Sequence, residues 1–207
     1  YNGMANMYYL IGDVYYNMPD YEKAFQAYGQ SKDYYRKDGD ELSAYSMLAS
    51  MAECKNLLGK ASESLPLALE AAEFFAQSPD AGKECYAYGK TISTAAIACA
   101  YMDSIALAYQ YAREAKPIFE AEGDRESYSY YLNELCLAIA AARLNRPDAK
   151  ELVSVVKKEM DGIGWTGSSD YAMLCQHYLH LHIDSMSQEE IISMIKTILN
   201  TFGSALG

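Results

Sequence analysis

Proline, glycine and runs of β-branched residues are all scarce in this sequence. Its 207 residues include five prolines and 13 glycines, whereas Ala, Leu, Met, Glu and Lys are plentiful. The plentiful residues are good helix formers, and few helix breakers separate them. Hydrophobic residues make up 51% of the chain, which supplies a continuous core and excludes wholesale disorder. The composition therefore predicts an all-α protein.

Basic residues are also few. Lys and Arg number 17 against 28 Asp and Glu, so the formal net charge is -11. A field of this sign repels phosphate groups, which argues against DNA or RNA binding by this segment and favours basic or neutral partners. Tyrosine, by contrast, occurs 20 times. A tyrosine-rich surface suits contact with other proteins.

Long apolar runs are missing as well. No stretch of 18 apolar residues occurs, so we expect no membrane insertion by this segment. No secretory signal is recognisable. The chain begins with Tyr1 inside a helical pattern, and we therefore expect it to be a piece of a longer protein. Its compartment, cytoplasm or bacterial cell envelope, stays open.

Paired cysteines and the common catalytic motifs are absent. The five cysteines are an odd number, contain no CxxC pair and lie inside helical patterns, which predicts buried free thiols. They are Cys54, Cys85, Cys99, Cys136 and Cys175. The sequence has no nucleophile elbow, no phosphate loop and no zinc site of paired cysteines. It therefore predicts a protein that is not an enzyme and uses no cofactor.

Two segments match ligand-binding patterns only in part. Residues 162–167 spell GxGxxG, but a charged helical segment precedes them where a dinucleotide site needs a strand. We interpret them as an inter-helix linker with Trp165 as a packing anchor. His177 and His180 are three residues apart and could share a metal on one helix face. Since no HExxH accompanies them, we expect ordinary histidines and no metal site.

The clearest pattern lies in residues 8–31, where large and small residues alternate at spacings of three and four. This spacing, on both sides of Pro19, predicts two amphipathic helices folded back across a short turn. Small residues are expected where the helices approach closely, and tyrosines beside them. The pattern consists of Tyr8, Ile11, Gly12, Tyr15, Ala24, Tyr28 and Ser31.

Breaks recur along the chain at regular intervals. Gly39-Asp40 and Gly123-Asp124 are 84 residues apart, or two units of 42, and residues 78–82 form another break midway. A fixed period of this length is typical of helical repeats. We expect repeats at about 4–38, 42–77, 82–122 and 124–161, followed by closing helices at about 168–202.

The spacing in residues 8–31, with its looser copies, resembles the tetratricopeptide repeat, in a long form similar to bacterial arrays. The resemblance implies a right-handed α-solenoid of antiparallel helix pairs, with about four repeats and a C-terminal capping pair. A shift of one residue in the fourth repeat fits nearly as well. The positions that match the packing residues of repeat one are Leu48, Met51, Ala52, Ser64, Ala68, Ala71, Ile92, Ala95, Ala96, Cys99, Ala108, Ala112, Ala115, Asn133, Cys136, Leu137, Ala140 and Ala149.

Prolines and small polar residues predict several helix ends. Pro19 fits the first position of the second helix, where a missing N–H costs nothing. Ser62 can cap the fourth helix, which would leave Pro66 in its first turn. Pro117 predicts a kink or an early end. Ser187 and Glu190 form a capping box before the last helix.

The resemblance also implies a function, which is non-enzymatic binding of a protein or peptide in a groove lined by the first helix of each pair. An alternative is a ligand-sensing regulatory segment of a larger bacterial sensor or transcription regulator. Alanine-rich residues 95–100 and 138–142 also permit a homo-oligomer. The groove positions are Asn6, Tyr9, Asp13, Tyr16, Asn17, Ser46, Glu53, Asn56, Lys90 and Ser93, with Asn133 and Glu134 as candidates in the fourth repeat.

Overall fold

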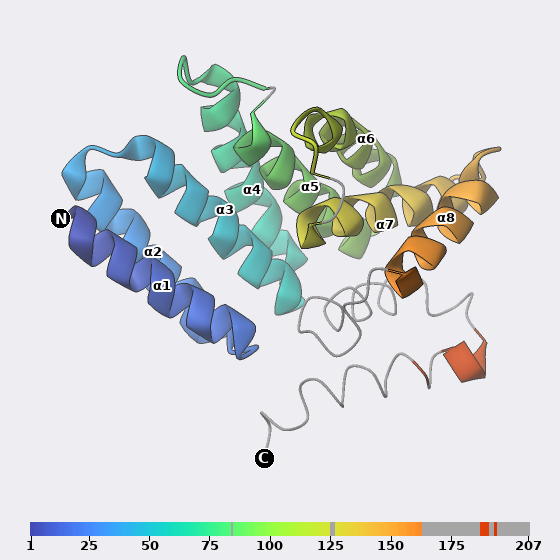
Figure 1. The fold of residues 1–207 in the computed structure, drawn as a ribbon, viewed down its shortest axis with the longest axis horizontal. Helices are drawn as coiled ribbons and strands as arrows, with labels where there is room; N and C mark the ends of the chain where they lie inside the picture. The colour runs from blue at the N-terminus through green and yellow to red at the C-terminus, as the bar shows by residue number, and fades with distance from the viewer. Residues whose placement is uncertain (84, 125–126, 163–186, 191–192, 194–207) are drawn as a thin grey trace.

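The computed structural model describes residues 1–83, 85–124, 127–162, 187–190 and 193 (Figure 1). Within these ranges the regular structure is entirely helical, and none of the helices is long and apolar enough to cross a membrane. The eight full helices are α1 (Asn2–Asn17), α2 (Tyr21–Asp38), α3 (Glu41–Leu57), α4 (Ala61–Gln77), α5 (Tyr86–Tyr101), α6 (Ile105–Ala121), α7 (Tyr128–Arg143) and α8 (Ala149–Gly162).

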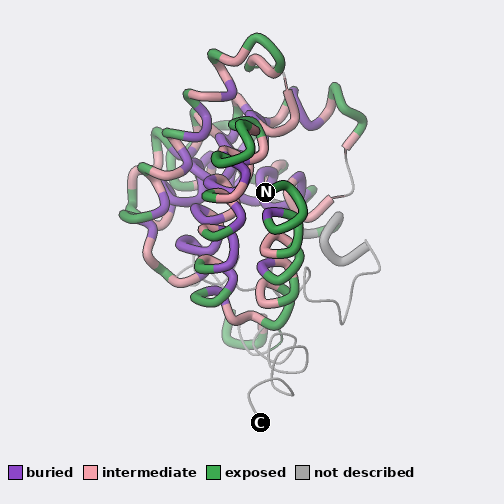
Figure 2. Tube along the Cα trace, turned by 90° about the vertical axis from the view of Figure 1, so that its left-hand side faces the viewer, coloured by how far each residue is buried: buried purple, intermediate pink, exposed green. Residues whose placement is uncertain are grey.

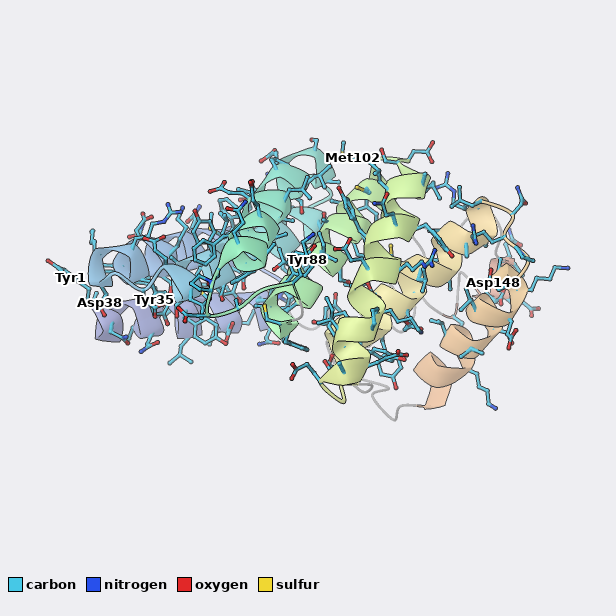
Figure 3. The ribbon with its side chains drawn as sticks, turned by 90° about the horizontal axis from the view of Figure 1, so that it is seen from above. Tyr1, Tyr35, Asp38, Tyr88, Met102 and Asp148 are labelled. Carbon is cyan, nitrogen blue, oxygen red and sulfur yellow. The ribbon has the colours of Figure 1, made fainter. Side chains whose placement is uncertain are left out.

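Consecutive helices pack against one another throughout the array. Each forms a hairpin with the next, and the first helices of the later pairs also touch, α3 with α5 and α5 with α7. Seen from above, the pairs follow one another from Tyr1 at one end to Asp148 at the other (Figure 3). The expected all-α solenoid of stacked helix pairs is confirmed. Most of the expected closing helices lie outside the described residues.

Glycines end the helices at the predicted breaks. Gly39 has φ +80° and Gly123 has φ +71°, left-handed conformations that favour glycine. Asp40 then accepts a hydrogen bond from the Ser43 N–H at 3.0 Å and starts α3. After Gly123, the Asp124 carboxylate accepts from the Ser127 N–H at 3.1 Å. Asp40 is therefore the N-cap of α3, whereas α7 is capped by Ser127, whose hydroxyl oxygen accepts a hydrogen bond from the Tyr130 N–H at 3.1 Å.

The expected capping box is present. The Ser187 N–H donates to Glu190 Oε2 at 3.0 Å, and the Glu190 N–H donates to Ser187 Oγ at 3.3 Å. Residues 188–190 are helical. The two side chains thus satisfy backbone donors at both sides of the helix start.

Two predicted helix starts are wrong. Pro19 precedes the first helical position, because the Asp20 carboxylate accepts from the Lys23 N–H and caps α2 instead. Helix α4 begins at Ala61 with Lys60 as its N-cap, so Ser62 lies inside the first turn. Gly59, with φ +71°, turns the chain between α3 and α4, and Ala61 and Ser64 in the first turns of α4 are buried. Pro66 consequently lies within the helix.

Helix α6 does not end early at Pro117. It continues to Ala121, and Ile118 and Phe119 beyond the proline are buried. Burial of large apolar side chains contributes about 1.5–3 kcal/mol each. This is comparable to the cost of about 3 kcal/mol for a proline inside a helix. Tertiary packing therefore offsets the local preference for a break.

Small residues lie where α1 and α2 come closest, as predicted. Gly12 is buried, and a Cβ atom placed there would lie 2.5 Å from Cε1 of Tyr28. Near the other end of α1, Ser31 Oγ donates to the carbonyl oxygen of Ala5 at 2.8 Å. The matching alanines in the next two pairs, Ala52 and Ala96, are fully buried. Close helix contact in each of these pairs thus depends on the absence of a large side chain.

Four of the five cysteines fall in described residues, and all four are free thiols. Cys54, Cys99 and Cys136 are buried as predicted, and burial raises the pKa of Cys136 to about 12. Cys85 is half-buried and has a different role, since its sulfur accepts a hydrogen bond from the Tyr88 N–H at the start of α5. The buried thiols act as small apolar packing residues.

Candidate functional site

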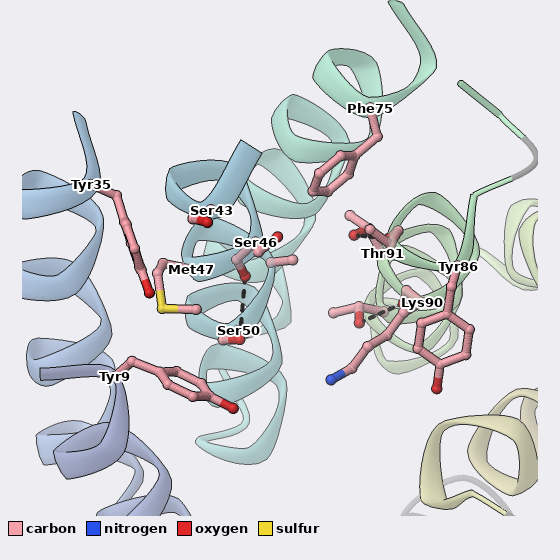
Figure 4. A pocket seen from close by; sticks show the side chains of 13 residues that line it. Tyr9, Tyr35, Ser43, Ser46, Met47, Ser50, Phe75, Tyr86, Lys90 and Thr91 are labelled. Atoms are coloured by element: carbon pink, nitrogen blue, oxygen red, sulfur yellow. Dashed lines mark hydrogen bonds between the residues drawn. The ribbon is translucent and has the colours of Figure 1, made fainter. Parts of the chain in front are cut away.

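A cavity of about 340 Å³ opens on the face of the array formed by α1, α3 and α5 (Figure 4). Tyr9 of α1, Ser46 of α3 and Lys90 of α5 line it, and all three were predicted as groove residues. Tyr35 and Phe75 reach the cavity from α2 and α4. The cavity is therefore shared by the first three helix pairs.

Helical spacing gathers small hydroxyl residues on the wall of this cavity. Ser43, Ser46 and Ser50 are three or four residues apart on α3, which places them on one face of the helix. The Ser46 hydroxyl donates to the carbonyl oxygen of Leu42 at 3.0 Å. The Ser50 hydroxyl donates to the carbonyl oxygen of Ser46 at 3.3 Å. Since each proton is already used, these hydroxyl oxygens present acceptor lone pairs.

Helix α5 contributes the same chemistry from the opposite wall. The Thr91 hydroxyl donates to the carbonyl oxygen of Ala87 at 2.6 Å. The Thr94 hydroxyl donates to the carbonyl oxygen of Lys90 at 3.1 Å. Both threonines line the cavity, and Thr91 lies on the same helix as Lys90 (Figure 4). Hydrogen-bond acceptors on two walls suit a ligand that brings N–H or O–H donors.

Lys90 supplies a positive charge to the cavity lining. Its Nζ lies 4.0 Å from Glu53 Oε2, and its side chain is 42% exposed. The other oxygen of Glu53 accepts a hydrogen bond from the Tyr16 hydroxyl at 2.6 Å. Burial, followed by the charge of Glu53, holds the pKa of Tyr16 well above its usual value. Glu53 therefore accepts a hydrogen bond from Tyr16 with one oxygen and lies beside the Lys90 ammonium group with the other.

No known family model matches this chain, and no curated protein matches it either. Within the described ranges, no group of three or more His, Cys, Asp and Glu side chains is placed to hold a metal ion. His177, His180, Trp165 and most of the GxGxxG segment lie outside those ranges.

The polar residues of α1 mainly join α1 to α2. Asn6 Oδ1 accepts a hydrogen bond from the Tyr35 hydroxyl at 2.6 Å. Asp13 accepts one from the Tyr28 hydroxyl at 2.7 Å. A hydrogen bond with Asp13, together with burial, raises the pKa of Tyr9. Asn17 is exposed, and its amide donates to the carbonyl oxygen of Asp13 at 2.8 Å. These polar residues of α1 thus lie at one edge of the face formed by α1, α3 and α5. Among the predicted groove residues of α1, Tyr9 lines the cavity.

Several predicted groove residues are buried between helices. The Asn56 amide donates to the carbonyl oxygen of Thr94 at 3.0 Å, and Ser93 is also buried. Asn133 is fully buried and donates to the carbonyl oxygen of Ala112 at 2.9 Å. Glu134 is buried and forms an ion pair with Lys116. The structure does not bring these four to the cavity. Asn56 is covered by α5, and Asn133 and Glu134 are covered by α6.

Sequence reasoning missed a second group of lining residues. Tyr35 and Phe75 come from second helices, which the groove prediction left out. Ser43 and Ser50 flank the predicted Ser46 at helical spacing, and Tyr86 precedes Lys90 by four residues. Extending each predicted position by three or four residues along its helix would have found these last three. No sequence signal identified Tyr35 and Phe75, because their position at the cavity depends on how successive helix pairs stack.

Proposed function

We propose that this chain is a tetratricopeptide-type array that binds a protein or peptide at the cavity between α1, α3 and α5. The observation that carries the proposal is the lining itself, in which side chains of three successive helix pairs face one open space of about 340 Å³. Each wall belongs to a helix packed on its neighbours. A rigid receptor of this kind binds an extended segment without first paying for its own ordering.

The chemistry of the lining favours a peptide over an apolar ligand. Serine and threonine oxygens offer acceptors to backbone N–H groups, and Tyr9 and Tyr86 add rings that lose little freedom on binding. Lys90 can pair with an acidic group on the peptide, because Glu53 holds it only at 4.0 Å. We expect peptides with small or polar residues and one carboxylate.

The ionisable groups around the cavity support recognition and not catalysis. Glu53 accepts from the Tyr16 hydroxyl, and Asp13 accepts from the Tyr28 hydroxyl. Both tyrosines have pKa values raised above the usual range, with burial as the largest cause. Tyrosines whose pKa values are raised in this way stay protonated near neutral pH and are poor proton carriers. We therefore propose a non-enzymatic role.

Selection from a displayed peptide library tests the proposal. Peptides that enrich on the native chain should bind Lys90→Glu at least about tenfold more weakly, because the variant reverses the charge beside the ligand. Ser50→Phe, which fills the cavity without changing its charge, should weaken the same peptides. Lys150→Glu is the matched control, an exposed lysine on α8 away from the cavity. Equal binding by all four chains, or no enrichment, would refute the proposal.

The size of the cavity supports one alternative, a regulatory segment that senses a small molecule. Its volume of about 340 Å³ falls within the range of about 300–1,000 Å³ that small-ligand sites occupy. A thermal-shift screen of metabolites distinguishes the two functions. A compound that stabilises the native chain and not Ser50→Phe would favour the sensor, provided that the peptide selection yields nothing.

A further inference from the structure

Exposed large apolar side chains gather on one helix of the described chain. On α1 they follow one another from end to end, whereas elsewhere they occur singly, as at Leu107 on α6. Single exposed apolar residues are ordinary, but a contiguous patch marks an interaction surface. Much of α1 is exposed in the end-on view, below the N label (Figure 2). The apolar face of α1 consists of Met4, Met7, Leu10, Ile11 and Val14 on the helix and Met18 at its C-cap, each between 39% and 59% exposed.

The equivalent face is buried in α3 and α5, the first helices of the next two pairs. Forty residues later, Met47, Met51 and Cys54 are buried in α3, which packs on α2. A Cβ atom on Gly29 of α2 would lie 3.8 Å from the Cε atom of Met51. Eighty-four residues after Ile11, Ala95 is fully buried in α5, which packs on α4. The array itself therefore shows that a helix is what covers this kind of face.

The apolar face of α1 is complementary to itself. Met4, Met7, Ile11, Val14 and Met18 follow at spacings of three and four, the pattern of a helix–helix seam. The series is nearly symmetric about Ile11, with Met4 and Met18 each seven residues away. In an antiparallel pair related by a two-fold axis, Ile11 meets its own copy, Met4 meets Met18, and Met7 meets Val14.

Charge does not oppose such a pair. Although the chain carries a formal net charge of -11, Asp13 is the one charged residue in the α1 segment. Its carboxylate accepts a hydrogen bond from the Tyr28 hydroxyl at 2.7 Å, on the side of α2. We propose that the apolar face of α1 binds the same face of a second copy of this chain, forming an antiparallel, two-fold symmetric dimer. This surface is separate from the proposed ligand site.

Analytical ultracentrifugation of the full chain tests the dimer. The native chain should sediment as a concentration-dependent dimer, and Val14→Glu should weaken dimerisation by about tenfold or more. Leu107→Glu is the matched control, because it places the same charge on an exposed apolar residue of another helix. Circular dichroism checks that every variant stays helical. A native monomer across the concentration range, or a Val14→Glu dimer as tight as the native one, would overturn the proposal.

Mixing two variants tests the antiparallel arrangement. Met7→Lys and Val14→Glu should each dimerise weakly alone, since each places two charges against apolar residues. Together they should form a mixed dimer, in which the introduced lysine of one chain faces the introduced glutamate of the other. The contact between the remaining native Val14 and Met7 is retained on the opposite side of the two-fold axis. Recovery of the dimer in the mixture supports the pairing of Met7 with Val14, and no recovery would reject it.

Discussion

Gly12 shows how a single residue sets the distance between two helices. Its backbone lies against the ring of Tyr28, whose hydroxyl in turn donates to Asp13. A methyl group at position 12 would lie 2.5 Å from a ring carbon, so either the ring or the helix must move. Any such movement also disturbs the hydrogen bond to Asp13, because ring and hydroxyl shift together.

We therefore predict that Gly12→Ala lowers the free energy of unfolding by about 1–3 kcal/mol, the usual range for overpacking. Gly3→Ala is the matched control on the same helix, because no atom lies within 4 Å of the Cβ position there. The control should raise stability by up to about 1 kcal/mol through helix propensity. Urea denaturation measures both variants. A Gly12→Ala chain as stable as Gly3→Ala would show that α1 and α2 are not in close contact.

The residue scale also shows how far the sequence alone could predict the site. Tyr9 and Lys90 line the cavity, and both were predicted because they match the groove positions that the resemblance to tetratricopeptide repeats implies. Asn56 has the same kind of position in its helix, yet it is buried against Thr94. Helical spacing predicts on which side of its helix a side chain lies. It does not predict whether another helix pair packs against that side.

At the scale of one element, α4 contains a proline that local preference would exclude. Pro66 has no N–H to donate to the carbonyl oxygen of Ser62, one turn earlier. The helix nevertheless begins at Ala61, and Ala61, Ser64 and Ala68 are buried. Ser64 Oγ also donates to the carbonyl oxygen of Ala52 at 2.7 Å, which ties the first turns to α3. Packing, not propensity, determines where α4 starts.

Replacing this proline should consequently stabilise the protein. Pro66→Ala restores one helix hydrogen bond at an exposed position and should raise the free energy of unfolding by about 1–3 kcal/mol. Pro79→Ala, between α4 and α5, restores no helix hydrogen bond and should change it by less than about 1 kcal/mol. Chemical denaturation compares the two. A destabilised Pro66→Ala chain would indicate that α4 begins after the proline.

The elements themselves were largely predictable, because glycine and aspartate mark their ends. Gly39 and Gly123 adopt left-handed conformations that few other residues tolerate, and their spacing predicted the pairs. Helix α7 was harder to place. Every residue from Tyr130 to Ala141 is buried, so no polar face shows which side meets which neighbour. A shift of one residue in the fourth pair stays compatible with this burial.

At the scale of the whole molecule, contacts run mainly between neighbouring helices. Each of the described helices packs on the one before and the one after it, and the longer-range contacts join α3 with α5 and α5 with α7. In such a quasi-one-dimensional array, stability is a sum of terms for each repeat and its interfaces. A substitution that destabilises one helix pair should therefore destabilise the adjacent pairs less, and distant pairs least.

Hydrogen exchange of Gly12→Ala tests this local response. Exchange should accelerate most in α1 and α2, less in α3 and α4, and least in α7, because each interface transmits only part of the lost stability. Asn133→Ala is the mirror-image variant, since it removes the buried hydrogen bond from α7 to Ala112 of α6. It should accelerate exchange in α6 and α7 and spare α1. Equal acceleration along the whole chain by either variant would show that the array unfolds as one cooperative unit.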